Sequence, residues 1–160
     1  MNNRWLVVLF SASALVTISL GIRQGMGLFL GPISFDLGTG RELFSLAIAV
    51  QNILWGLSSP FFGMMADRIG GWKVASLGGL LYAIGLLLMA GVVSPEGMLI
   101  GNFFVGLGLG SAGMAVALGA VSRSVPAEKR PLALGIVTSL GSFGQFALVP
   151  LTQIVILGYG

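Results

Sequence analysis

The sequence has no cysteine and no histidine, and it has very few charged residues. Without cysteine the chain can form no disulfide and no thiolate metal site, and without histidine it lacks the commonest catalytic base and metal ligand. Charged residues make up 8% of the 160 residues, whereas a soluble domain has roughly 25%. Hydrophobic residues make up 56%, and the mean hydropathy is +1.00. We therefore expect an integral membrane protein whose main solvent, and first partner, is the lipid bilayer.

The remaining charges exclude two further classes of function. Eight Lys and Arg against five Asp and Glu give a net charge of +3, but the cations form no continuous stripe of the kind that binds nucleic acid. No nucleic-acid partner is expected. The acidic residues all lie outside the long apolar runs, so no set of side chains supports bond-making chemistry in the membrane. We expect no enzyme activity, no metal and no cofactor.

Long uncharged runs define the fold. Residues 43–66 are 24 uncharged residues and residues 74–95 are 22 more, and about 20 apolar residues span a bilayer as a helix. The first run stays uncharged over residues 5–22, longer than the core of a secretion signal, so we interpret it as an uncleaved helix. The pattern predicts an all-α membrane fold of five transmembrane helices, at approximately 5–34, 43–65, 72–93, 97–121 and 131–156.

The positive charges predict an orientation. If the N-terminus is cytoplasmic, that side carries six cations: Arg4, Arg68, Lys73, Arg123, Lys129 and Arg130. The opposite side carries only Arg41. Cytoplasmic loops are enriched in Lys and Arg, so we expect a multi-pass protein of the cell (inner) membrane with its N-terminus in the cytoplasm.

Glycine is abundant, with 26 residues, and most of it lies inside the predicted helices. Small residues let helix backbones approach closely in lipid. The run of Gly106, Gly108 and Gly110 is therefore predicted to pack against neighbouring helices.

The connection between the second and third helices carries a motif. It reads Gly63-Met-Met-Ala-Asp67-Arg68-Ile-Gly70, which resembles the Gly-x-x-x-Asp-Arg/Lys-x-Gly signature of the major facilitator superfamily in spacing, position and side of the membrane. Residues 21–29 and 133–151 are similar to the first and fifth helices of the monocarboxylate-porter and oxalate/formate-antiporter branch.

The resemblance implies an architecture. Residues 1–160 would form a partial N-terminal six-helix bundle, one half of a twelve-helix transporter. A missing C-terminal half, or a second chain, would be needed to complete it. No cofactor is implied; the coupling would be to protons or to the exchange of anions.

The sequence departs from the family pattern at two places, and the second bears on the function. The signature usually continues Gly-Arg-Arg/Lys, but here Gly71 and Trp72 precede a single cation, Lys73. Asn102 occupies the position of an arginine that is linked to proton coupling in drug antiporters of the superfamily. Its absence argues against drug/proton antiport.

The resemblance also gives the hairpin a gating role, in which Asp67 latches the cytoplasmic side against the second half. The gating candidates are Gly63, Asp67, Arg68, Gly70 and Lys73. The alternative is that these charges only anchor the topology.

Arg23 is the sharpest candidate for a substrate contact, because a charge in the hydrocarbon region is expensive and usually faces a cavity or a partner. The planar guanidinium group can donate two parallel hydrogen bonds to the two oxygens of a carboxylate. The alternative is a structural arginine bonded to helix carbonyls or snorkelling outward. Amides inside the predicted helices are further candidates, with interhelical hydrogen bonding as their alternative role: Gln24, Gln51, Asn52, Asn102 and Gln145.

Together these features predict a secondary active transporter for a small organic anion, a carboxylate, working by alternating access. The alternative is a truncated or partner-dependent membrane scaffold with no transport of its own.

Overall fold

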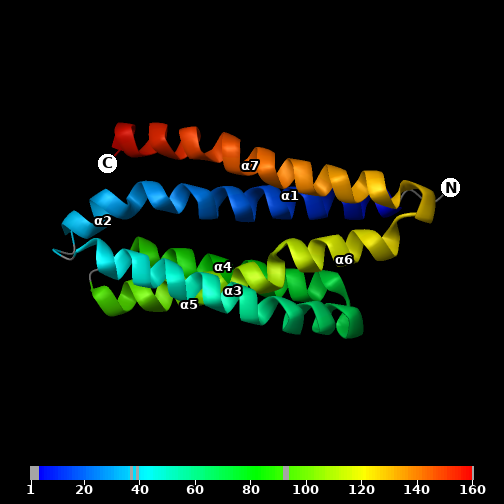
Figure 1. Ribbon diagram of the computed structural model, residues 1–160, viewed down its shortest axis with the longest axis horizontal. Coiled ribbons are helices and arrows are strands. Elements are labelled where there is room, and N and C mark those ends of the chain that lie inside the picture. Colours follow the sequence, from blue (N-terminus) through cyan, green and yellow to red (C-terminus); the bar gives the residue numbers. More distant parts are fainter. Residues whose placement is uncertain (1–3, 37, 39, 92–93, 160) are drawn as a thin grey trace. The chain divides into compact units, whose positions relative to one another are not determined.

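The computed structural model describes residues 4–36, 38, 40–91 and 94–159, and within these ranges it contains helices and no strand (Figure 1). The prediction of an all-α fold is confirmed. The helices, in chain order, are α1 (Arg4–Gly25), η1 (Met26–Phe29), α2 (Leu30–Asp36), α3 (Arg41–Ile69), α4 (Gly71–Ala90), α5 (Pro95–Ala112), α6 (Met114–Ser124), η2 (Ala127–Lys129) and α7 (Arg130–Tyr159).

Five helical spans among the described residues are long and apolar enough to cross a membrane, as the sequence predicts. They are Arg4–Phe35, Arg41–Ile69, Gly71–Ala90, Pro95–Ser124 and Ala127–Gly158. The first and fourth spans are less regular than expected. A turn of 3-10 helix, η1, follows Gly25, and the extended backbone of Gly113 separates α5 from α6. Both interruptions fall at glycines, which resist helix formation more than other residues except proline.

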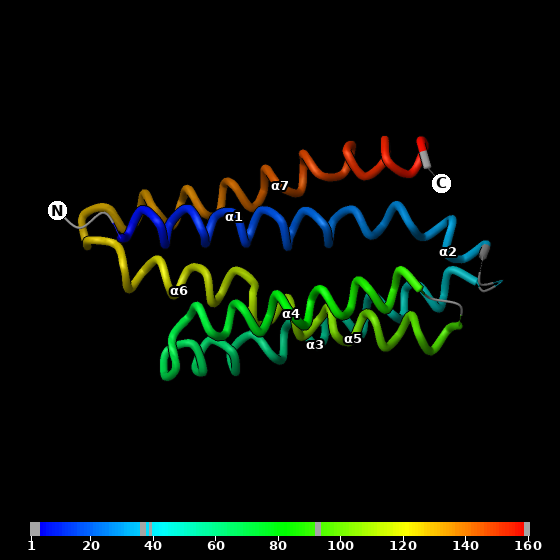
Figure 2. Tube along the Cα trace, turned by 180° about the vertical axis from the view of Figure 1, so that it is seen from behind, coloured from blue at the N-terminus to red at the C-terminus, as the bar shows by residue number. Residues whose placement is uncertain are grey.

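The helices group into two compact units. The first comprises residues 29–112, with α2 to α5. In it α5 packs against both α3 and α4 (Figure 2). A Cβ added at Gly106 would lie 2.7 Å from the Gln51 carbonyl oxygen of α3, and one at Gly108 would lie 2.7 Å from the Tyr82 nitrogen of α4. The predicted packing role of these glycines is therefore confirmed.

The second unit comprises residues up to 28 and from 113 onward, with α1, α6 and α7. Helices α1 and α7 lie side by side along their length (Figures 1 and 2). The Thr17 hydroxyl of α1 donates a hydrogen bond of 3.0 Å to the Leu140 carbonyl of α7. One and two turns on, Gly21 contacts Gly144 and Leu148, and Gly25 contacts Thr152. Since residue numbers rise together in both helices, α1 and α7 are parallel.

The hairpin between α3 and α4 turns at a single glycine. Gly70 has a φ of +99°, and its N–H donates to the Ala66 carbonyl at 3.1 Å, which closes the last turn of α3. Only glycine adopts such a φ without strain. The final Gly of the motif is thus required by the backbone itself.

Candidate functional site

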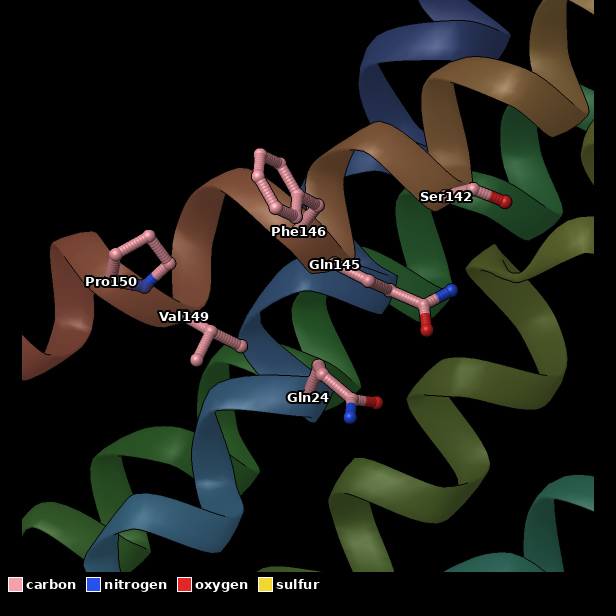
Figure 3. Close-up of a pocket in the computed structure, with 6 residues that line it drawn as sticks. All are labelled: Gln24, Ser142, Gln145, Phe146, Val149 and Pro150. Atoms are coloured by element: carbon pink, nitrogen blue, oxygen red, sulfur yellow. The ribbon is translucent and has the colours of Figure 1, made fainter.

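An open groove of about 500 Å³ lies between α1 and α7. Its lining residues are Gln24 of α1 and Ser142, Gln145, Phe146, Val149 and Pro150 of α7 (Figure 3). Figure 3 shows the amides of Gln24 and Gln145 extending from the two helices toward the same side. Two of the six predicted substrate-contacting residues therefore meet at one site.

The parallel contact of α1 and α7 explains this meeting. Gly21 lets the two backbones approach closely one turn before Gln24, and Gly144, which it touches, immediately precedes Gln145. The groove is therefore fixed by the glycine contact. Phe146, Val149 and Pro150 add an apolar lining, so the site combines two amides with a hydrocarbon surface, as small-molecule sites commonly do.

Arg23 immediately precedes Gln24 and is half-buried, with its Nε atom shielded from solvent. It lies in the last turn of α1, because the α-helix ends at Gly25 and gives way to η1. A cation is favoured there by the negative end of the helix dipole. The sequence pattern predicted one helix over residues 5–34, so it did not place Arg23 near a helix end.

The other three amides belong to the unit of residues 29–112. Asn52 donates a hydrogen bond to the Ile48 carbonyl of its own helix at 2.9 Å. Asn102 is fully buried and donates to the Met98 carbonyl at 3.0 Å and to the Met89 sulfur of α4 at 3.6 Å. Gln51 is also buried, and no described group donates to its side-chain oxygen. The contacts of Asn102 are those of a residue that joins helices.

Sequence reasoning missed four groove residues, which are Ser142, Phe146, Val149 and Pro150. All four lie on the same helix face as Gln145, because residues 142, 145, 146, 149 and 150 follow the i, i+3, i+4, i+7, i+8 spacing. The helical spacing from Gln145 could therefore have indicated them.

The hairpin residues proposed for gating lie at the end of α3 and the start of α4. Asp67 and Arg68 are exposed in the last turn of α3, which extends to Ile69 and so beyond the predicted end at residue 65. The Lys73 ammonium lies 5.8 Å from the centre of the Trp72 ring. Gly63 lies within α3, and a Cβ there would meet no atom within 4 Å. Their gating role remains a prediction.

Acidic side chains form no group of three or more that could hold a metal ion anywhere in the described part of the chain. The five spans, glycine-packed helices and amide-lined groove define the class as a multi-pass α-helical membrane protein.

The sequence model of the Major Facilitator Superfamily matches residues 7–160, and the chain belongs to this family. Similar curated proteins include NiaP of Bacillus subtilis, named as a niacin/nicotinamide transporter, which is 34% identical over 70% of the chain and 28% of its own length. The oxalate:formate antiporter of Oxalobacter formigenes is 24% identical over 98% of the chain and 37% of its own length. Monocarboxylate transporter 13 of Rattus norvegicus is 30% identical over 97% of the chain and 36% of its own length.

These matches confirm the resemblance to the oxalate/formate and monocarboxylate branch. Proteins named for glucose and inositol transport match as well, so the relatives' names cover both anions and neutral polyhydroxy compounds. The chain spans about a quarter to two fifths of the length of the three relatives described above.

Proposed function

We propose that this protein is a secondary active transporter that moves a small organic anion, a carboxylate, across the cell membrane by alternating access. The observation that carries the proposal is the groove in which Gln24 and Gln145 present amides from two parallel helices. Arg23 precedes Gln24 in the last turn of α1 and is not one of the groove's lining residues, so its part in binding is proposed from its charge and its place in the sequence. Membership of the superfamily supports a transport role, and all three relatives described above are named as transporters.

The chemistry of these side chains favours a carboxylate. A guanidinium offers parallel N–H donors that match the two carboxylate oxygens, and each glutamine amide adds two further donors. A groove of about 500 Å³ lies within the usual range for small-molecule sites. The apolar side chains of Phe146 and Val149 would contact the hydrocarbon part of such an anion.

Uptake by proteoliposomes tests the substrate class with two isosteric pairs, nicotinate against nicotinamide and formate against formamide. We expect transport of the acids in preference to their neutral amides. Equal uptake of acid and amide would overturn the carboxylate proposal while leaving a transport role intact. Stimulation by an acidic exterior would indicate proton coupling, and stimulation by anion on the opposite side would indicate exchange.

Alternating access needs a second bundle that closes on the other side of the substrate. We propose that a further six-helix half, in the same polypeptide or in a partner chain, supplies this second bundle. Asp67 and Arg68 would contact that half at the cytoplasmic surface. The N-terminus would then be cytoplasmic. If no preparation transports any anion while the protein still inserts in the membrane, the alternative of a membrane scaffold is favoured.

A further inference from the structure

One end of the α1–α7 pair gathers three cations and one tryptophan, which we call the basic end. Its members are Arg4 and Trp5 of α1, Lys129 of η2 and Arg130 of α7. The helix register brings them together. Thr17 meets Leu140 and Gly25 meets Thr152, which are offsets of 123 and 127 residues, so Trp5 falls opposite residues 128–132. The Lys129 ammonium indeed lies 5.3 Å from the centre of the Trp5 ring.

The charge of the basic end is poorly compensated within its own helices. Arg4 and Lys129 are exposed and Arg130 is half-buried, while the adjacent acid on η2 is the single exposed Glu128. Both α1 and α7 begin at this end, so the positive ends of two helix dipoles lie beside the cations. Cations at this end of a helix are electrostatically unfavourable, and an external anion would relieve the repulsion.

The surface next to the basic end is hydrocarbon. Val7 and Phe10 of α1 are 67% and 77% exposed, and Leu132 of α7 is 69% exposed, all within two turns of the cations. Tryptophan prefers the headgroup level of a bilayer. Along the helix pair the surface therefore presents first cations, then an aromatic ring suited to the headgroup level, and then apolar side chains. A phospholipid has its phosphate and its acyl chains in the same order, whereas a free phosphate ion would contact only the cations.

We propose that the basic end binds the headgroup phosphate of an anionic phospholipid, with Arg4, Lys129 and Arg130 as its ligands and the acyl chains against Val7, Phe10 and Leu132. This inference does not rest on the transport function. Each Lys or Arg near an anionic membrane surface increases the equilibrium constant for binding to that surface about fivefold. Selectivity for an anionic over a zwitterionic lipid is thus expected to fall by up to about fivefold for each cation removed.

Tryptophan quenching in vesicles measures this selectivity directly. A Trp55→Phe, Trp72→Phe variant leaves Trp5 as the reporter among the three tryptophans of the chain. It is reconstituted in phosphatidylcholine vesicles that contain a minor share of brominated phosphatidylglycerol or of brominated phosphatidylcholine with the same acyl chains. We expect stronger quenching by the brominated phosphatidylglycerol, and loss of the difference in the Arg4→Gln, Lys129→Gln, Arg130→Gln variant.

Arg41→Gln is the matched control, because Arg41 is an exposed cation at the start of α3 that lies outside the basic end. It should retain the full difference. Lys129→Gln alone should keep the helical circular dichroism signal and reduce the difference in quenching. This result would separate lost binding from lost folding. Equal quenching by both lipids would overturn the proposal. So would displacement of phosphatidylglycerol by inorganic phosphate at constant ionic strength, which would indicate a site for free anions.

Discussion

Gly21 of α1 lies against Gly144 of α7, so closely that a Cβ on Gly21 would be 2.8 Å from the Gly144 carbonyl oxygen. In lipid the hydrophobic effect does not drive helices together, and close van der Waals contact has to do so. This glycine pair therefore sets the separation of the two helices that carry Gln24 and Gln145. The shape of the candidate site depends on residues that cannot themselves bind a substrate.

Gly144→Val should destabilise the protein by about 1–3 kcal/mol, the usual cost of forcing side-chain atoms into a packed interface. A Cβ at Gly144 would meet the backbone and side chain of Thr17, which cannot move away freely. Thermal unfolding in detergent, followed by circular dichroism, measures the loss. Gly135→Val is the control on the same helix, since a Cβ there meets no atom within 4 Å. Equal melting temperatures for the two variants would show that the close contact is not a source of stability.

Thr17→Val should cost about 0.6 kcal/mol, the mean value of an interhelical hydrogen bond in a membrane protein. The substitution keeps the shape of the side chain and removes the donor to the Leu140 carbonyl of the neighbouring helix. Thr138→Val is the matched control, because the Thr138 hydroxyl bonds the Leu134 carbonyl within its own helix. The same unfolding assay should find the Thr17 variant less stable than the Thr138 variant, and the reverse order would contradict the assignment.

Gly70→Ala should cost about 1–3 kcal/mol, because an alanine is strained at a φ of +99° with a ψ of 136°. Gly63→Ala changes the same motif at a helical position where a Cβ meets no atom within 4 Å, so it should be neutral or slightly stabilising. Measuring the unfolding of both variants separates the effect of the backbone conformation of Gly70 from the effect of altering the motif at any glycine. Similar stability of both would refute a special role for the Gly70 conformation.

The fold was largely predictable, because a charge-free run long enough to cross a bilayer is a signal of composition and needs no tertiary information. The breaks at Gly25 and Gly113 were not, since glycine within a membrane helix serves equally well as a packing residue. Gly106 and Gly108 have that role, whereas Gly113 has an extended backbone. Nothing local distinguishes these cases.

The site was predictable only in part for a related reason. Gln24 and Gln145 could be selected as polar residues in apolar helices, but their meeting depends on the register of α1 against α7. Asn102 has the same sequence signature, yet its amide bonds the Met98 carbonyl and the Met89 sulfur. Polarity identifies candidates, and packing decides which of them share a groove.

The proposed orientation predicts a sharp difference between two exposed glutamates, Glu96 and Glu128. Glu96 should face the outside and Glu128 the cytoplasm. The chain has no cysteine, so Glu96→Cys and Glu128→Cys each introduce a single thiol without altering the count of Lys and Arg. A membrane-impermeant maleimide should label Glu96→Cys in intact spheroplasts and Glu128→Cys only after lysis. The opposite pattern would invert the topology.

The central claim is that Arg23, with Gln24 and Gln145, recognises a carboxylate. Arg23→Gln should reduce the uptake of nicotinate or formate at least tenfold, because charge-assisted hydrogen bonds are about twice as strong as neutral ones. The control is Ile154→Ala, a substitution at an exposed position of α7 that does not line the groove, which should leave uptake unchanged.

The most direct measurement is the ratio of acid to amide uptake, nicotinate against nicotinamide, in proteoliposomes of the unaltered protein and of Arg23→Gln. We predict a ratio well above one that falls toward one when the guanidinium is removed. An unchanged ratio in a variant that still inserts and transports would contradict the role of Arg23 and with it the proposed carboxylate site.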